Sequence, residues 1–149
     1  MTSIDRHEQL ITEGLKLHEG RDYESAQLFF QRAIADCPNC VVARYNLANT
    51  LHTLYRDSEA TLILKNLLAT DDEILFDGCP LNEDPTPFKI DTLYLMFLTI
   101  LGDTGNWDDA YQFGLQHLEA RKETTDFLFS DEYVATEMEA LKLEFKTHE

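Results

Sequence analysis

The feature that most constrains this chain is a short sequence pattern that occurs three times. Each copy is a polar turn followed by acidic residues and then an alanine, and the three alanines are Ala26, Ala60 and Ala110. The step from Ala26 to Ala60 is 34 positions, and the step from Ala60 to Ala110 is 50, which is one period plus 16. A fixed period of this length is typical of stacked supersecondary units. The pattern therefore predicts a repeat architecture.

Apolar and small residues recur at helical spacing on both sides of the first turn. Glycine and proline are scarce, with 6 and 4 residues, which favours long helices. We expect helices near residues 4–19, 22–36, 41–55, 57–70, 88–103, 107–122 and 131–146. The first unit has one stripe before the turn and another after it, and a proline closes it: Leu10, Gly14 and Leu17, then Ala26, Phe30, Ala33 and Ile34, then Pro38.

This arrangement resembles the tetratricopeptide repeat (TPR), a helical hairpin of about 34 residues. The second unit fits as well, although Asp72 stands where the closing proline belongs. In the third unit Gly114 and His117 stand where an aromatic and a small residue are expected. The resemblance covers about two thirds of the chain. It implies an all-α fold: a right-handed solenoid of three TPR-like helix hairpins plus a C-terminal capping helix.

The resemblance also implies one domain over residues 1–149. Its repeats are expected at about 7–40, 41–74 and 91–124, its capping helix at about 131–146, and an inserted loop, rich in proline, at 75–90. The run Leu93–Leu101 is apolar on all sides, so it needs burial on more than one side. Burial within the repeats, a homodimer surface and an apolar groove are the three interpretations of this run.

The charge is concentrated in the second half of the chain. Residues 1–70 hold 9 acids and 7 bases (net −2), and residues 71–149 hold 19 acids and 5 bases (net −14), which sum to −16. Such a field disfavours nucleic acid and anionic membranes as partners, because phosphate binding needs clustered Lys and Arg. It favours a basic partner, unless it serves only solubility. With no export signal or apolar membrane span in the sequence, we expect a cytoplasmic protein with reduced thiols.

Cysteines are the one candidate for special chemistry. Cys37 and Cys40 form a C-x-x-C, and Cys79 and His7 are expected at the same edge of the repeats. A metal-binding or redox-responsive module built on Cys37, Cys40 and Cys79 is therefore the alternative function. The repeat already explains the C-x-x-C, since it falls where TPRs carry a polar turn. No catalytic or nucleotide-binding motif occurs, so we expect neither an enzyme nor a cofactor.

The TPR resemblance implies a function in protein binding. In that family the first helix of each hairpin lines a concave groove that takes a peptide or helix of a partner. Asn46 alone matches the clamp with which some TPR co-chaperones hold a C-terminal carboxylate. Ile11 and Leu15 stand at two positions where that clamp has a lysine and an asparagine. We therefore expect an adaptor or chaperone-like module, as monomer or homodimer, for an apolar or basic segment. The expected groove residues are Ile11, Leu15, His18, Tyr45, Asn46, Asn49, His52, Leu95 and Thr99.

Overall fold

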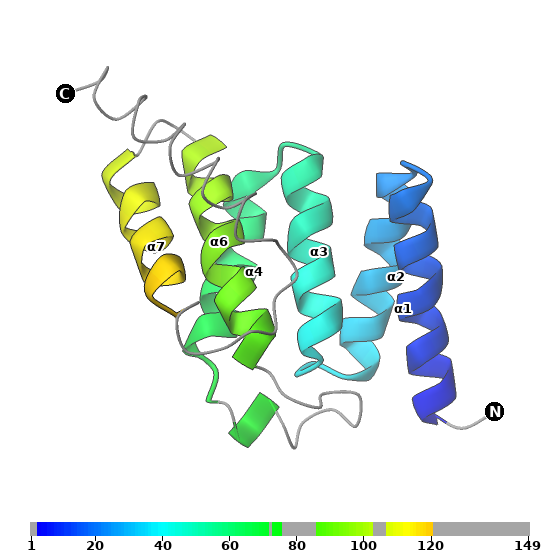
Figure 1. Ribbon diagram of the computed structural model, residues 1–149. Coiled ribbons are helices and arrows are strands. Elements are labelled where there is room, and N and C mark those ends of the chain that lie inside the picture. The colour runs from blue at the N-terminus through cyan, green and yellow to red at the C-terminus, as the bar shows by residue number, and fades with distance from the viewer. Residues whose placement is uncertain (1–2, 72, 76–85, 103–106, 121–149) are drawn as a thin grey trace. The chain divides into compact units, whose positions relative to one another are not determined.

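The computed structural model describes residues 3–71, 73–75, 86–102 and 107–120 (Figure 1). The chain divides into two compact units, Met1–Thr86 and Pro87–Glu149, and each is considered by itself below. Within the described residues all regular structure is helical, and no strand occurs. The described residues of the first unit form four helices and a helical turn at 73–75: α1 (Ser3–Glu19), α2 (Tyr23–Asp36), α3 (Val41–Thr53) and α4 (Asp57–Ala69). Those of the second unit form α6 (Thr86–Gly102) and α7 (Trp107–Ala120).

The six helices expected over these ranges are present, with small differences at their ends. The helix expected at 41–55 ends at Thr53, because Tyr55 adopts a φ of 61° that a right-handed helix cannot continue. The helix expected from residue 88 begins at Thr86, so the end of the loop expected at 75–90 is helical. Pro87 fits a first helical turn, whose N–H groups have no intrahelical acceptor. The capping helix expected at 131–146 lies outside the described residues.

The α1–α2 turn is closed by a pair of crossed backbone hydrogen bonds. The Asp22 N–H donates to the Leu17 carbonyl at 2.9 Å, and the Arg21 N–H donates to the His18 carbonyl at 3.0 Å. This is the Schellman arrangement, and Arg21 takes its left-handed position with a φ of 65°. Asp22 then caps α2, because its Oδ1 accepts from the Ser25 N–H at 3.3 Å.

The α3–α4 turn repeats this geometry at the equivalent positions of the second hairpin. The Arg56 N–H donates to the Leu51 carbonyl at 2.8 Å, and the Tyr55 N–H donates to the His52 carbonyl at 3.0 Å. Tyr55 holds the left-handed position that Arg21 holds in the first turn. Neither residue is glycine, the usual choice there, so the turn is set by its hydrogen bonds and flanking helices rather than by glycine's freedom. The turns of the two hairpins are therefore equivalent in backbone geometry.

Small residues let the helices of each hairpin approach closely. Gly14 on α1 faces Phe30 on α2, and a Cβ added at Gly14 would meet Phe30 Cε1 at 2.7 Å. The equivalent pair in the second hairpin is Ala48 and Leu64, both with no exposed surface. Ala48 is larger than Gly14, and Leu64 is smaller than Phe30, so the combined volume of the two side chains at each crossing is similar. The two hairpins also pack on each other through α2 with α3 and α1 with α3 (Figure 1).

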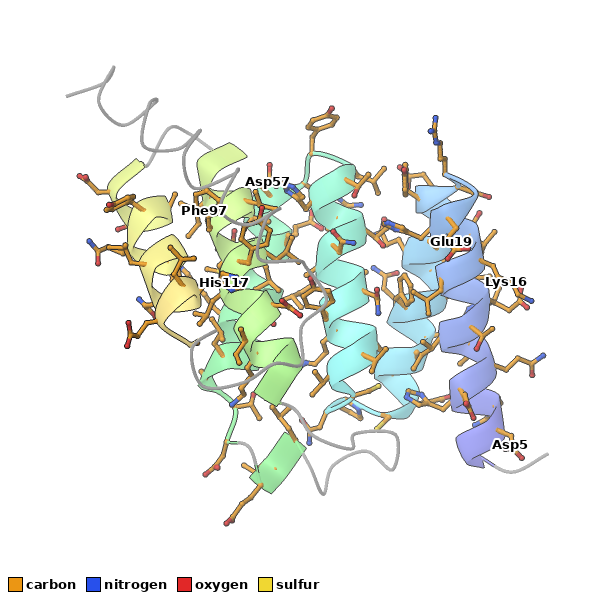
Figure 2. All side chains as sticks on the ribbon, viewed as in Figure 1. Asp5, Lys16, Glu19, Asp57, Phe97 and His117 are labelled. Carbon is orange, nitrogen blue, oxygen red and sulfur yellow. The ribbon has the colours of Figure 1, made fainter. Side chains whose placement is uncertain are left out.

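The described part of the second unit is a helix pair packed around aromatic residues. Tyr94 and Phe97 of α6 form a buried cluster with Ala110 of α7. His117 of α7 is fully buried, lies 5.2 Å from the Tyr94 ring between centroids, and donates from Nδ1 to the Ile90 carbonyl at 2.9 Å (Figure 2). The carbonyl bond satisfies a polar atom that burial would otherwise penalise. His117 can therefore occupy the position of Ala33 and Leu67 in the earlier hairpins.

Helix α6 is apolar around most of its circumference. Its buried side chains include Ile90, Tyr94, Leu95, Met96 and Phe97, which point in all directions from the helix axis. Residues 94–97 of the run Leu93–Leu101 thus have the burial on several sides that the sequence requires. Over the described residues, none of the helices combines the length and the hydropathy needed to cross a membrane.

Candidate partner-binding surface

The candidate surface of the first unit is formed by α1 and α3, the first helices of the two hairpins. These helices contact each other, and His18 is joined to Thr50 by a side-chain hydrogen bond of 3.1 Å. The expected groove residues of the first unit therefore lie on two helices that contact each other. Leu95 and Thr99 belong to the second unit, with 1% and 0% of their surface exposed.

Two of the expected groove residues in the first unit are core residues. Ile11 is 6% exposed and packs in a cluster with Ala33, Cys40 and Ala43. Tyr45 is 4% exposed, so its ring is part of the core and is not accessible to a partner. Helical spacing assigns a residue to a side of its helix, but it does not show how far a neighbouring helix covers that side. The accessible candidates are Leu15, His18, Asn46, Asn49 and His52.

A chain of hydrogen bonds fixes the polar groups between α1 and α3. The Thr50 hydroxyl donates to the Asn46 carbonyl at 2.8 Å, so it accepts from Nδ1 of His18. The Asn46 amide donates to the Val42 carbonyl at 2.8 Å, one turn earlier in α3. Asn46, the single match to a carboxylate clamp, thus spends a donor on its own helix. Burial lowers the pKa of His18, and the charge of Glu19 opposes this effect, so the lowered pKa favours the neutral imidazole.

Asn49 differs from Asn46 in what its side chain does. Its backbone carbonyl accepts from the Thr53 hydroxyl at 2.9 Å, but its side-chain amide makes no hydrogen bond within the described part of the chain. An amide offers both a donor and an acceptor, which suits it to pair with the backbone of a bound segment. Leu15, with 38% of its surface exposed, supplies an apolar contact on α1. Leu15 and Asn49 are therefore the apolar and the polar group that this face offers for contact.

His52 serves the fold rather than the surface. Its Nδ1 donates to Asp57 Oδ1 at 2.6 Å, and Asp57 opens α4 with only 9% of its surface exposed (Figure 2). The equivalent contact in the first hairpin is His18 against Tyr23, with ring centroids 5.0 Å apart. Each histidine therefore ties the end of a first helix to the start of its second helix.

Two exposed acids on α1 were not among the residues expected from the sequence. Glu8 and Glu19 stand at helical spacing on either side of Leu15, and both are exposed. Glu19 lies at the end of α1 that leads into the first turn (Figure 2). The two acids frame the exposed apolar contact with negative charge. The i, i+7, i+11 spacing of Glu8, Leu15 and Glu19 could have identified this stripe, but acids are common on solvated helix faces and the signal is weak.

Cys37 and Cys40 form no recognisable metal site with the other described residues. Cys37 and Cys40 stand on either side of the α2–α3 turn, and neither is in a disulfide. Burial lowers the pKa of His7, and the charge of Asp36 opposes this effect. Over the described residues, no three His, Cys, Asp or Glu side chains are placed to hold a metal ion. Cys79, the third cysteine of the alternative function, lies outside those residues.

No protein-family model matches the chain, and no curated protein has a significant match to it. The fold and the surface together define an all-α protein of paired helices. Any closer assignment depends on the residues and contacts of this chain itself.

Proposed function

We propose that this chain is a TPR-like adaptor that binds a peptide or helix of another protein on the α1–α3 face. The observation that carries the proposal is the equivalence of the two hairpins: their turns share one hydrogen-bond pattern, in which Tyr55 takes the place of Arg21. In this proposal the third hairpin and a helix at 131–146 continue the array as a right-handed solenoid. Repeats of this kind present the first helices of successive hairpins as one extended binding surface.

The chemistry of the α1–α3 face suggests the kind of segment it binds. Leu15 offers an apolar contact, and Asn49 offers a donor and an acceptor that are not used within the described part of the chain. Glu8 and Glu19 add exposed negative charge on α1, and the whole chain carries a net charge of −16. An apolar segment with flanking Lys or Arg is complementary to this face. Nucleic acid and anionic membranes are not, and the proposal assigns the protein no catalytic step.

Site-specific photo-crosslinking in the native host tests which face binds a partner. A photoreactive amino acid is placed at Leu15 or at Asn49 on the first helices. Matched controls carry it at Leu28 or Leu62, which are 55% and 63% exposed and occupy equivalent positions on the two second helices. The proposal expects one protein to be crosslinked from both first-helix positions. Crosslinks to a partner from Leu28 and Leu62 alone would contradict it.

A homodimer is tested by the same experiment, since a crosslinked product of twice the chain mass would show a second copy on this face. Such a product as the sole outcome would replace adaptor binding by self-association. Crosslinked peptides that are apolar with basic flanks would support the assigned partner chemistry.

A further inference from the structure

The turn between the first two hairpins holds two cysteines in one small space. Cys37 follows the last residue of α2, Cys40 precedes the first residue of α3, and the Cys40 N–H donates to the Cys37 carbonyl at 3.1 Å. A four-residue turn with this bond keeps its end Cα atoms within about 7 Å. A disulfide needs Cα atoms about 4.4–6.8 Å apart, so the backbone of this turn is close to the required geometry.

The side chains also share one environment. Cys40 is fully buried in the cluster with Ile11, Ala33 and Ala43, and Cys37 is a partly exposed member of the shell around that cluster. One thiol can therefore be reached from solvent, while the other can be reached only from within the protein. This asymmetry is what separates an attacking thiol from a resolving thiol in disulfide exchange.

From this arrangement we infer that Cys37 and Cys40 form a reversible thiol–disulfide switch in the turn that joins the two hairpins. The oxidant is a low-molecular-weight disulfide such as glutathione disulfide. The Cys37 thiolate attacks one sulfur of that disulfide, forms a mixed disulfide and releases one glutathione thiol. Cys40 then attacks the Cys37 sulfur and releases the second glutathione thiol. Two protons and two electrons leave the protein, and one glutathione disulfide becomes two glutathione molecules.

The disulfide acts on the packing between hairpins. Cys40 belongs to the cluster that Ile11 of α1 and Ala43 of α3 complete, so a bond from its sulfur to Cys37 changes the packing between these helices. The new bond also restrains the turn. This inference does not depend on the adaptor function, and it needs neither a metal nor Cys79.

The test uses the full chain with Cys79→Ser, so that Cys37 and Cys40 are its remaining thiols. The folded protein is equilibrated in glutathione buffers of increasing oxidation, the remaining thiols are alkylated, and the intact mass is measured. We expect a product about 2 Da lighter than the reduced chain and without alkylation, which excess reduced glutathione converts back. In a matched variant that adds Cys40→Ala, which keeps a small apolar side chain in the cluster, the reaction should stop at a glutathione adduct on Cys37.

Two results would overturn the inference at the chemical step. One is a Cys79→Ser chain that accumulates the glutathione adduct or stays reduced in every buffer. The other is a disulfide that forms only after the protein is unfolded in urea. Hydrogen exchange over residues 34–44 then tests the switch, with slower exchange expected in the oxidised chain because the bond restrains the turn. Equal exchange rates in the two redox states would show that the disulfide does not change the turn, which would overturn the switch.

Discussion

Exchanging the crossing residues of the first hairpin for those of the second is the sharpest test of their equivalence. Gly14→Ala places a Cβ 2.7 Å from Phe30 Cε1 and 2.9 Å from Cζ, and the ring has no exposed surface into which it could turn. Overpacking of this kind costs about 1–3 kcal/mol. Alanine regains about 0.5–1 kcal/mol of helix propensity over glycine. We therefore expect Gly14→Ala to lower the free energy of unfolding by about 0.5–2 kcal/mol.

Phe30→Leu alone should also destabilise, by about 1–2 kcal/mol, because it leaves part of the ring's volume empty against Gly14. The double variant recreates the Ala48 and Leu64 pair of the second hairpin, in which the larger small residue faces the smaller bulky one. The added methyl group then occupies space that the ring has vacated. We therefore expect the double variant to lose about 1–2 kcal/mol less stability than the sum of the two single losses.

The assay is urea unfolding followed by circular dichroism for the two single variants, the double variant and the parent. Gly20→Ala is a matched control, since its Cβ would meet nothing closer than the Lys16 carbonyl oxygen at 3.4 Å. It should not lower the stability, and it should raise it by up to about 0.4–1 kcal/mol because alanine restricts the unfolded chain. Additive effects of Gly14→Ala and Phe30→Leu would refute the reasoning, because they would show that the two crossings are not built in the same way.

Three further predictions concern single positions. Tyr55→Gly should raise the free energy of unfolding by about 0.5–1 kcal/mol in urea melts, because Tyr55 has a φ of 61° and 91% of its surface exposed; a loss of stability would contradict the turn geometry. Arg44→Leu should raise the free energy of unfolding by about 1 kcal/mol, and with it the melting temperature, because Nη1 of Arg44 is buried without a hydrogen-bond partner in the described part of the chain. Leucine also stands at the equivalent position of the first hairpin, Leu10. An unchanged or lower melting temperature would show that the charge of Arg44 is compensated. Burial lowers the pKa of His18 below 6.5, so the unfolded state takes up its proton first and stability should fall as the pH drops below 6.5; His18→Gln should make this fall shallower in melts at pH 5.5–7, and an unchanged slope would exclude His18 as a source.

The sequence predicted the described helices well because small residues recur along it where two helices cross closely. Ala26, Ala33, Ala48 and Ala60 have no exposed surface, so each lies where a larger side chain would not fit. Tyr23, the first residue of α2, packs edge-on against His18 of α1. Period and residue size together define these positions.

Other features could not be predicted from the pattern. The Schellman turns use Arg21 and Tyr55 in the left-handed position, where glycine is the recognisable signal. The burial of Ile11 and Tyr45 depends on how closely α1 and α3 approach, which spacing along one helix does not contain. The different roles of Asn46 and Asn49 in α3 could not be predicted either. The side-chain amide of Asn46 donates to the Val42 carbonyl of the same helix, whereas that of Asn49 makes no hydrogen bond within the described residues.

The most direct test of the proposed binding face is the affinity of the crosslinked partner for three forms of the purified chain. Calorimetric titration compares the parent with Asn49→Ala, which removes the uncommitted amide of α3, and with a variant that carries Glu83→Lys and Asp84→Lys in the acidic half of the sequence. Binding on the α1–α3 face predicts that Asn49→Ala weakens the affinity about tenfold, from the loss of a hydrogen bond in a desolvated contact. It also predicts that the charge-reversed variant binds almost as the parent does. Unchanged affinity for Asn49→Ala, with affinity lost only on charge reversal and falling steeply with salt, would instead place the partner on the acidic segment.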